Sequence, residues 1–442
     1  MIPLLLLLAI GGMMQAARSF TTDTALAGTE LGFGFLLLAS FFTGKIFNRL
    51  GLPKLTGYLA AGVIAGPYVL EFVTKDMGVS LKVVSSTATA ILALEAGSEL
   101  EIKKIKPILK TLRGITLFAV VGSMFMIAGA LFFMRPMFPA IFDKLDTQQS
   151  IAVCFAIGVA LSAQSPAVVM AMLAETRAEG PLSRTMLASV VVADLTVITL
   201  FSIVLAITGA VIGGQVDVAG TAISVVWELL GSMVFGVLLG MLIGQFLLSV
   251  KKGASMFTLL VNVIVAEIGV RMHLDPLIVM LAAGIWLRNF SRADSTKMMH
   301  DFQAAQLPVF LVFFALAGSK LDVNTLFASL LPVAIIAVVR AGSFFTGAKI
   351  ACKMSGAEPV ISKYAWFGLV PQAGLALALA LVLKNTLPQF GFDQEAGDTA
   401  AVILFGVVGF NECVAPIILR IMLIRSGEAG KKQGVDFAAG GH

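Results

Sequence analysis

One carboxylate, Asp194, lies in an otherwise apolar run, SVVVADLTVITL at residues 189–200. The surrounding apolar segment, residues 184–211, is long enough to cross a membrane as a helix and places Asp194 near its middle. An ionised carboxylate at that depth costs about 2.5–3.5 kcal/mol on insertion scales. A carboxylate kept there either holds a proton or, when ionised, helps to bind a small hard cation. We therefore predict that a proton and a cation compete for Asp194.

Two more charged residues lie in the middle of apolar segments, Arg340 in residues 328–352 and Glu412 in residues 397–424. Ionisable residues inside the membrane face the protein interior and usually have a function. We expect both to compensate charge around Asp194; a purely structural salt bridge is the alternative. The three cysteines and three histidines are scattered, without a ligand spacing. We therefore expect no protein-bound metal and no cofactor, only transported ions.

Prolines beside small and polar residues interrupt two apolar segments near mid-span. Residues 160–168 read ALSAQSPAV, and residues 368–375 read GLVPQAGL. A proline removes one backbone donor and disturbs the preceding turn, so we predict two broken helices, with two ordinary kinks as the alternative. Hydroxyl, amide and carbonyl oxygens at such breaks can bind a cation. The predicted ligands beside Asp194 are Ser162, Gln164 and Ser165, and the predicted break positions are Pro166, Pro371, Gln372 and Gly374.

The composition excludes a soluble globule, because 58% of the residues are hydrophobic, 13% are charged and the mean hydropathy is +0.96. We predict an all-α polytopic membrane protein with 13–14 transmembrane helices. The net charge of +5 does not indicate nucleic-acid binding. Assigning the loops alternately to two sides collects most of the 31 Lys and Arg on one side, which the positive-inside rule makes cytoplasmic. This predicts a cell (inner) membrane protein, in contact with lipids, whose C-terminus is cytoplasmic.

The N-terminal segment has two possible interpretations. Residues 1–17 are apolar but short and without a basic start, so they are either a retained helix, which we favour, or a signal peptide. The chain contains neither G-x-G-x-x-G nor a Walker sequence, and we expect no nucleotide-binding domain.

A short internal repeat relates the two halves. Residues 96–102 read AGSELEI and residues 317–323 read AGSKLDV, at the ends of two apolar segments that are seven segments apart. An odd offset makes the two copies face opposite ways across the membrane. Inverted repeats with paired broken helices are typical of secondary transporters, whose sites lie near mid-membrane. The same offset pairs the two proline-containing segments with each other, and pairs the Asp194 segment with the Glu412 segment.

The sequence RLGLPKLTGYLAAGVIAGP at residues 49–67 resembles the opening signature of the monovalent cation:proton antiporter-2 family, within the sodium/hydrogen exchanger superfamily. SPAVV at residues 165–169 and LPVF…AGSKLD at residues 307–322 are similar to that family's segments. The resemblance covers about residues 31–424. It implies that Asp194 is the essential aspartate and Arg340 the basic residue of the paired helix. It also implies the sodium/proton antiporter fold.

The resemblance further implies a homodimer in which a core moves like an elevator past a dimerisation scaffold. The expected divisions are an N-terminal helix or signal peptide with an external loop (1–30), scaffold (31–78 and, with a linking helix, 213–300), ion-transporting core (79–212 and 301–424) and a short cytoplasmic tail (425–442). Ala193 stands where electrogenic members carry a second acid, which favours electroneutral exchange. Ser189 stands where some electroneutral members carry a glutamate, and Ser165 where some carry an acid. Arg340 therefore lacks that glutamate, and we expect Asp194 or Glu412 to neutralise it.

We therefore predict secondary active exchange of Na⁺ or K⁺ for H⁺ at Asp194, and no enzymatic activity. Three alternatives stay open: a transporter of the same fold for an organic or inorganic anion bound by Arg340, a channel-like K⁺ efflux pathway, and a membrane sensor or scaffold that transports nothing.

Overall fold

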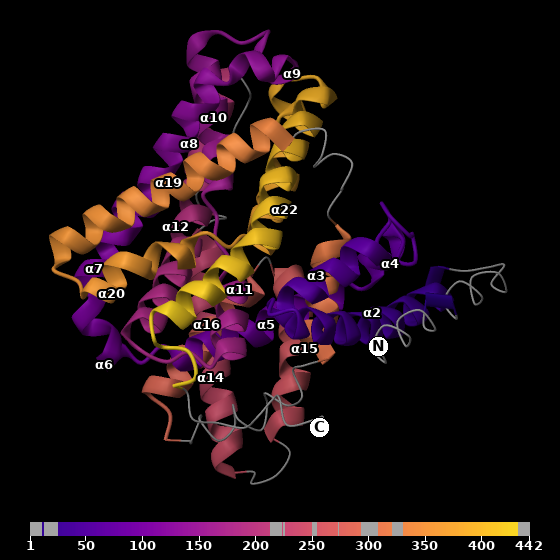
Figure 1. The fold of residues 1–442 in the computed structure, drawn as a ribbon, viewed down its shortest axis with the longest axis vertical. Helices are drawn as coiled ribbons and strands as arrows, with labels where there is room; N and C mark the ends of the chain where they lie inside the picture. Colours follow the sequence, from indigo (N-terminus) through magenta and orange to yellow (C-terminus); the bar gives the residue numbers. More distant parts are fainter. Residues whose placement is uncertain are drawn as a thin grey trace.

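Every regular element that the computed structural model describes is a helix (Figure 1). It describes residues 25–212, 226–249, 254–272, 274–292, 308–320 and 330–431, together with residues 11, 12 and 223. Apolar stretches become helices because only a helix satisfies all of its own backbone groups inside a lipid bilayer. The expected helix or signal peptide at residues 1–17, most of the linker before residue 226 and the last eleven residues of the tail lie outside the described residues.

The first half of the chain contains the Asp194 helix, α12, and the helices that precede it. They are α2 (Ala25–Arg49), α3 (Lys54–Ala65), α4 (Lys75–Ser80), α5 (Lys82–Glu99), α6 (Ile102–Ile105), η1 (Lys106–Ile108), α7 (Leu109–Gly114), the π-helix η2 (Ile115–Val121), α8 (Gly122–Phe133), η3 (Arg135–Met137), α9 (Pro139–Phe142), α10 (Thr147–Leu161), α11 (Pro166–Thr176) and α12 (Pro181–Ile212). The elements α6 to α8 follow one another without a gap, as one continuous span of residues 102–133.

The helices of the second half carry Arg340 and Glu412. They are the π-helix η4 (Trp227–Gly231), α14 (Ser232–Ser249), α15 (Ala254–Met272), α16 (Pro276–Asn289), the helix Pro308–Ser319, α19 (Leu330–Ser355), α20 (Pro359–Tyr364), η5 (Ala365–Leu369), α21 (Gly374–Thr386), η6 (Pro388–Phe390) and α22 (Gln394–Arg425). Arg340 lies in α19 and Glu412 in α22, as their apolar surroundings predict.

Fewer helices are long enough to cross a membrane alone than the 13–14 that the sequence predicts. In the described part of the chain seven helices have the length and hydropathy to do so, and a bent pair formed by Pro359–Leu369 and Gly374–Phe390 makes eight. Three more apolar helices, α3, α16 and Pro308–Ser319, are too short to span the hydrocarbon alone. Each of these short helices instead packs closely along another helix.

The helices form two bundles (Figure 1). In one, which we call the α12 bundle, the members pack in the pairs α8–α10, α10–α12, α8–α19, α19–α22 and α21–α22. In the other, the α16 bundle, α16 packs on both α5 and α14, and α3 packs on α2. The helix Pro308–Ser319 belongs with the α16 bundle, because its backbone touches that of α3.

Glycines place the short helices in direct backbone contact. A Cβ at Gly97 in α5 would lie 2.2 Å from the carbonyl oxygen of Leu281 in α16, and one at Gly284 would lie 2.4 Å from that of Leu94. Only glycine permits so close an approach. The repeated AGS sequence therefore has a structural role, since Gly97 is the central residue of its first copy.

The second copy of AGS makes the same kind of contact. A Cβ at Gly318 would lie 2.2 Å from the carbonyl oxygen of Leu59 in α3, and one at Gly62 would lie 1.8 Å from that of Ala315. The partner helices share a sequence as well, because residues 59–62 and residues 281–284 both read LAAG. The pair α5–α16 thus corresponds to the pair formed by Pro308–Ser319 and α3, as inverted repeats require.

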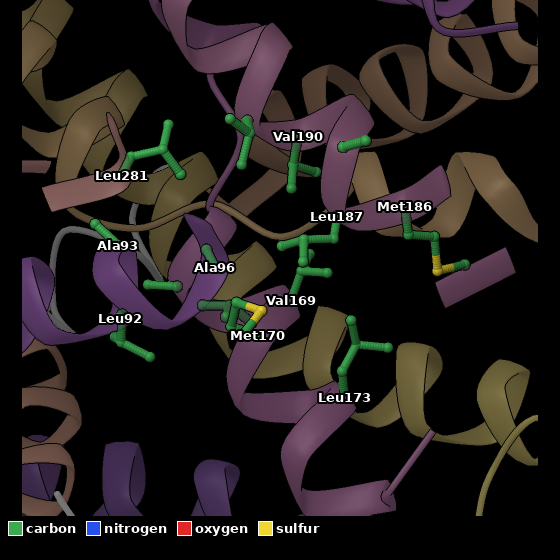
Figure 2. Packing of buried hydrophobic residues seen from close by; sticks show 14 of the residues in the cluster. Leu92, Ala93, Ala96, Val169, Met170, Leu173, Met186, Leu187, Val190 and Leu281 are labelled. Carbon is green, nitrogen blue, oxygen red and sulfur yellow. The ribbon is translucent and has the colours of Figure 1, made fainter. Parts of the chain in front are cut away.

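Two apolar clusters meet along α12. Val190 and Val191 belong to the cluster that contains Val168 to Met170 of α11. Ala193 and Val197 belong to a second cluster that contains Ala160, Leu161 and Ala163. Figure 2 shows the first cluster, in which Leu187 and Val190 of α12, Val169 and Met170 of α11 and Ala96 of α5 point toward one another. The α12 residues on either side of Asp194 therefore pack with residues on either side of the first helix break.

Candidate functional site

Both predicted helix breaks are present. The first separates α10, which ends at Leu161, from α11, which begins at Pro166. Pro166 occupies the first turn of α11, where its missing N–H costs nothing, and the extended residue Ser165 caps that turn. The second break separates η5 from α21, which begins at Gly374, and bends the span by 44°. Pro371 and Gln372 lie within this second break.

Arg340 joins the two breaks through backbone carbonyl groups. Its guanidinium donates to Leu161 O at 2.7 Å and Ala163 O at 2.8 Å in the first break, and to Val370 O at 2.6 Å and Leu369 O at 3.2 Å in the second. Carbonyl groups at a helix C-terminus lack partners within the helix and carry partial negative charge. The buried cation thus satisfies two helix ends at once, and its side chain is 0% exposed.

A side-chain network extends this link to α22. Gln372 donates from Nε2 to the same Leu161 oxygen at 3.0 Å, and Asn411 donates from Nδ2 to Gln372 Oε1 at 2.7 Å. All three residues are buried. Gln372, predicted only as a break position, therefore holds the two breaks and α22 in register.

The expected ion pair between Arg340 and a carboxylate is not formed. Within the described part of the chain, no carboxylate oxygen lies within salt-bridge distance of Arg340, neither that of Asp194 nor that of Glu412. The physical reason is that four carbonyl oxygens occupy its donors. Phe344, one turn further along α19, lies under the guanidinium at 4.6 Å from its ring centre.

Asp194 is buried in α12, with an exposed fraction of 3%. Its Oδ1 atom receives no hydrogen bond from any described residue. A buried carboxylate oxygen without a donor is rare in folded proteins, and such an oxygen can bind a proton or a cation. Ala193, directly before Asp194, belongs to the same apolar cluster as Leu161 and Ala163 of the first break.

The predicted ligands in the first break differ in their hydrogen bonding. Gln164 is 0% exposed and donates to the carbonyl oxygen of Ser162, while its Oε1 has no donor among the described residues. Ser165 accepts from the amide of Val168 at 3.2 Å, and Ser162 donates to Val159 O at 2.9 Å. Gln164 therefore offers an unpaired acceptor oxygen, whereas both serine hydroxyls already have a role in ending or starting a helix.

Glu412 is a second buried carboxylate with an unpaired oxygen. It lies in α22 with an exposed fraction of 2%, and its Oε2 has no donor within the described residues. It follows Asn411, which binds Gln372 of the second break. The structure thus connects the neighbour of Glu412 to the Arg340 network, but it does not place Glu412 in an ion pair.

A cavity of about 100 Å³ opens between the two bundles. It is bounded by the end of α5, by α6, by α11 and the first turns of α12, and by Arg288 of α16. Met170 lies in its wall one turn after the first break, and Leu187 lies there two turns before Asp194. Its polar wall includes the buried residue Glu95 of α5. Leu187 is the lining residue of this cavity that lies nearest to Asp194 along α12.

Two glutamates that sequence reasoning missed bind helix N-termini. Glu428, just after α22, accepts from the amides of Leu182 and Ser183 at 2.8 and 2.7 Å, and from the Ser183 hydroxyl at 2.6 Å. It therefore caps the Asp194 helix. Glu175, near the end of α11, accepts from the amide of Lys54 at the start of α3 at 2.8 Å. No sequence motif marks either contact, because the paired residues are more than a hundred positions apart.

The fold and this site define a class: a polytopic membrane transporter in which two broken helices accompany ionisable groups buried within apolar helices. The chain belongs to the sodium/hydrogen exchanger family, because the family model described as "Sodium/hydrogen exchanger, transmembrane" matches residues 36–425. This confirms the antiporter family that the sequence motifs resemble.

Known proteins agree with this assignment. The chain is 27% identical over 209 residues to the Na(+)/H(+) antiporter NhaP of Pseudomonas aeruginosa. That match spans 45% of this chain and 46% of the relative, so the alignment covers about half of each protein. Two structures of the sodium proton antiporter MjNhaP1 from Methanocaldococcus jannaschii share the fold at 16% identity. One, at pH 8, covers 91% of this chain and 99% of that chain with a TM-score of 0.66. The other covers 89% and 96% with a TM-score of 0.68.

Proposed function

We propose that the chain is a secondary active antiporter that exchanges a monovalent cation, Na⁺ or K⁺, for a proton at Asp194. The observation that carries this proposal is the pair of buried, unpaired acceptor oxygens, one on Asp194 and one on Gln164 of the first helix break. Oxygen atoms without donors bind a desolvated alkali cation, and an unpaired carboxylate also binds a proton. Coupling follows because the two ligands exclude each other.

The charge balance favours electroneutral exchange. Ala193 leaves one carboxylate at this point of α12, and Arg340 keeps its charge in every state because arginine does not deprotonate in proteins. A single bound Na⁺ and a single bound proton then give the loaded site the same total charge. The two half-cycles carry equal charge across the membrane, and the membrane potential does not drive the exchange.

The helix contacts support an elevator in which the moving part is the α12 bundle. The sequence-based divisions place α5 and the helix Pro308–Ser319 in the core. The backbone contacts at Gly97 and Gly318 instead favour placing both helices in the static scaffold, with α3 and α16. The core would then comprise α6 to α12 and α19 to α22. The cavity beside Glu95 and Leu187 lies between these two parts and would serve as the cytoplasmic route to Asp194.

The scaffold would also form the homodimer. Large apolar side chains are exposed along η4, α14 and α15, among them Trp227, Leu238, Met241 and Leu260, with exposed fractions of 44% or more. Lipid covers such a surface in a monomer and a second copy covers part of it in a dimer. The distribution of Lys and Arg supports a location in the cell (inner) membrane with the C-terminus on the cytoplasmic side.

The anion-carrier alternative is weakened by the bonding of Arg340. An anion at this site would have to compete with four carbonyl groups for the same donors. We therefore expect Arg340 to support the site structurally, while Asp194 and Gln164 bind the cation and Glu412 adjusts the local charge.

Proton flux in proteoliposomes tests this function. Purified protein is reconstituted with an internal pH dye and a preset pH gradient, and Na⁺, Li⁺, K⁺ or choline is added in turn, with and without a valinomycin voltage clamp. We expect an alkali cation to dissipate the gradient equally with and without the clamp, and Asp194→Asn to abolish this flux. Absence of any cation-dependent flux in wild type would overturn the proposal.

A further inference from the structure

A half-buried carboxylate joins the two bundles at the end of α11. Glu175 lies one residue before the end of that helix, and its side chain is 15% exposed. Its Oε1 accepts from the backbone amide of Lys54, the first residue of α3, at 2.8 Å. The residue before α3 is Pro53, whose side chain cannot cap a helix. The cap of α3 is therefore supplied by a helix of the other bundle.

The charged and titratable groups around this carboxylate come from two helices. Arg420 of α22 places its Nη1 atom 3.9 Å from the same oxygen, and its side chain is 24% exposed. On α3, Lys54 supplies the amide, and the phenol of Tyr58, one turn further on, is close enough to interact electrostatically with Glu175. Arg420 belongs to the same bundle as Glu175, so it orients the carboxylate without tying the two bundles together. The bond that crosses between bundles is the one to Lys54.

The two ends of α11 lie at different places in the molecule. Its first turn is capped by Ser165 at the helix break beside Gln164, and its last turn carries Glu175. Gly62 packs α3 directly against the backbone of Ala315, in a helix that the proposed division assigns to the static scaffold. Any sliding of the α12 bundle past α3 must therefore break the hydrogen bond between Glu175 and Lys54.

We propose that Glu175 is a latch that stabilises one of the two access states of the carrier by capping α3 across the boundary between core and scaffold. This inference rests on the proposed elevator exchange. A bond made in one state and absent from the other shifts the population between them. The apparent affinity of a cation at each membrane face equals the intrinsic affinity scaled by the fraction of carriers open to that face. Removal of the latch thus improves apparent affinity at one face and weakens it at the other.

The test measures half-saturating cation concentrations separately at the two faces of oriented proteoliposomes, with the ion among Na⁺, Li⁺ and K⁺ that wild type transports. For Glu175→Ala we expect several-fold changes in opposite directions at the two faces. Glu175→Gln keeps an acceptor oxygen without the charge and is expected to give a smaller change of the same sense. The matched control is Glu358→Ala, since Glu358 is an exposed N-cap residue that makes no side-chain cap.

Each outcome decides the matter. Opposite shifts at the two faces support the latch, whereas equal shifts at both faces, or none, refute it and make Glu175 a structural cap only. If Glu175→Ala does not fold, Glu175→Gln provides the same comparison. If wild type shows no cation-coupled flux, the proposed antiport fails and the latch fails with it. If wild type exchanges normally and both Glu175 variants match Glu358→Ala, the latch alone fails.

Discussion

Arg340 and Gln372 donate to one and the same acceptor, the backbone carbonyl oxygen of Leu161, at 2.7 and 3.0 Å. That oxygen ends α10 at the first break, while Gln372 lies in the second break. One carbonyl group therefore fixes the position of both breaks relative to α19. The sequence suggests that Arg340 and Asp194 act as a charged pair. In the structure Arg340 instead binds the backbone of the two helix breaks, and Asp194 takes no part in that hydrogen bonding.

Loss of Arg340 should therefore destabilise the protein strongly. Arg340→Ala removes the donor to three buried carbonyl groups, those of Ala163, Leu369 and Val370, and leaves Leu161 O with Gln372 alone. We expect a loss of about 3–5 kcal/mol in the free energy of unfolding. Arg340→Lys keeps the charge but not the planar set of donors, so it should recover only part of this. Thermal unfolding in detergent measures both. Lys353→Ala, an exposed position on the same helix, should stay within about 0.5 kcal/mol of wild type. A stable Arg340→Ala protein would contradict the proposed support role.

Asp194→Asn should not destabilise the protein, in contrast to Arg340→Ala. It removes a buried carboxylate that has an unpaired oxygen, so we expect unfolding stability equal to wild type or higher by about 1–3 kcal/mol. Cation-dependent proton flux should nevertheless be lost completely, since the shared ligand is gone. Thermal unfolding and liposome flux on the same preparation give both values. Lost flux accompanied by a large loss of stability would indicate a folding defect in place of a lost site.

The cap at the start of α12 predicts a local effect. Glu428→Ala removes an acceptor bound by two amides and one hydroxyl, and we expect a cost of about 1–3 kcal/mol. Hydrogen–deuterium exchange should speed up in the first turn of α12, at Leu182 and Ser183. Glu395→Ala, an exposed acid in the first turn of α22, serves as the control and should leave exchange in α12 unchanged. Unchanged protection at Leu182 in Glu428→Ala would refute the cap.

The glycine contacts of the α16 bundle predict position-dependent costs. Gly97→Ala and Gly318→Ala each place a methyl group 2.2 Å from a backbone oxygen, so helices must separate. We expect a loss of about 1–3 kcal/mol for each. Gly342→Ala in α19 meets nothing within 4 Å and should instead stabilise its helix by about 0.5–1 kcal/mol. Thermal unfolding of the three variants checks the order, and equal effects would contradict the close helix packing.

Glu101, in the linker between α5 and α6, should make the stability of the protein depend on pH. Hydrogen bonding from Lys104, together with Arg288, holds the pKa of Glu101 below its ordinary value of 4.5. A carboxylate whose pKa is lowered by folding adds stability above its unfolded pKa and loses it as the pH falls through the folded value. Wild type should therefore unfold at a higher temperature than Glu101→Gln at neutral pH, and this difference should shrink below about pH 4.5. A difference that stays constant with pH would exclude Glu101 as its source.

Much of the fold can be predicted from patterns along the sequence. The long apolar runs predict the spans, and Pro166 and Pro371 predict the two breaks, because a proline cannot continue the hydrogen bonding of a helix. The LAAG sequence that α3 and α16 share is a second sign of the inverted repeat. It could have been found in the sequence, but the prediction used the AGS repeat alone. Its meaning depends on which helices touch, since Gly62 and Gly284 matter only through the backbones that face them.

The partners of charged side chains could not be predicted in this way. Arg340 was expected to meet a carboxylate, whereas the carbonyl groups that bind it are present at every residue and leave no trace in a sequence. Glu428 and Glu175 each bind a backbone amide that is 121 or more positions away. Such contacts depend on the tertiary arrangement alone. The donor is a backbone amide, so the type of side chain on the donor residue does not affect them.

The cap at Glu428 has a consequence for biogenesis. Glu428 is synthesised 246 residues after Leu182, so α12 enters the membrane long before its own first turn can be capped. The helix that carries Asp194 therefore completes its hydrogen bonding only once α22 has been inserted and the chain has returned to it. Ribosome-bound intermediates shorter than this point hold Asp194 on a helix whose first turn Glu428 has not yet capped.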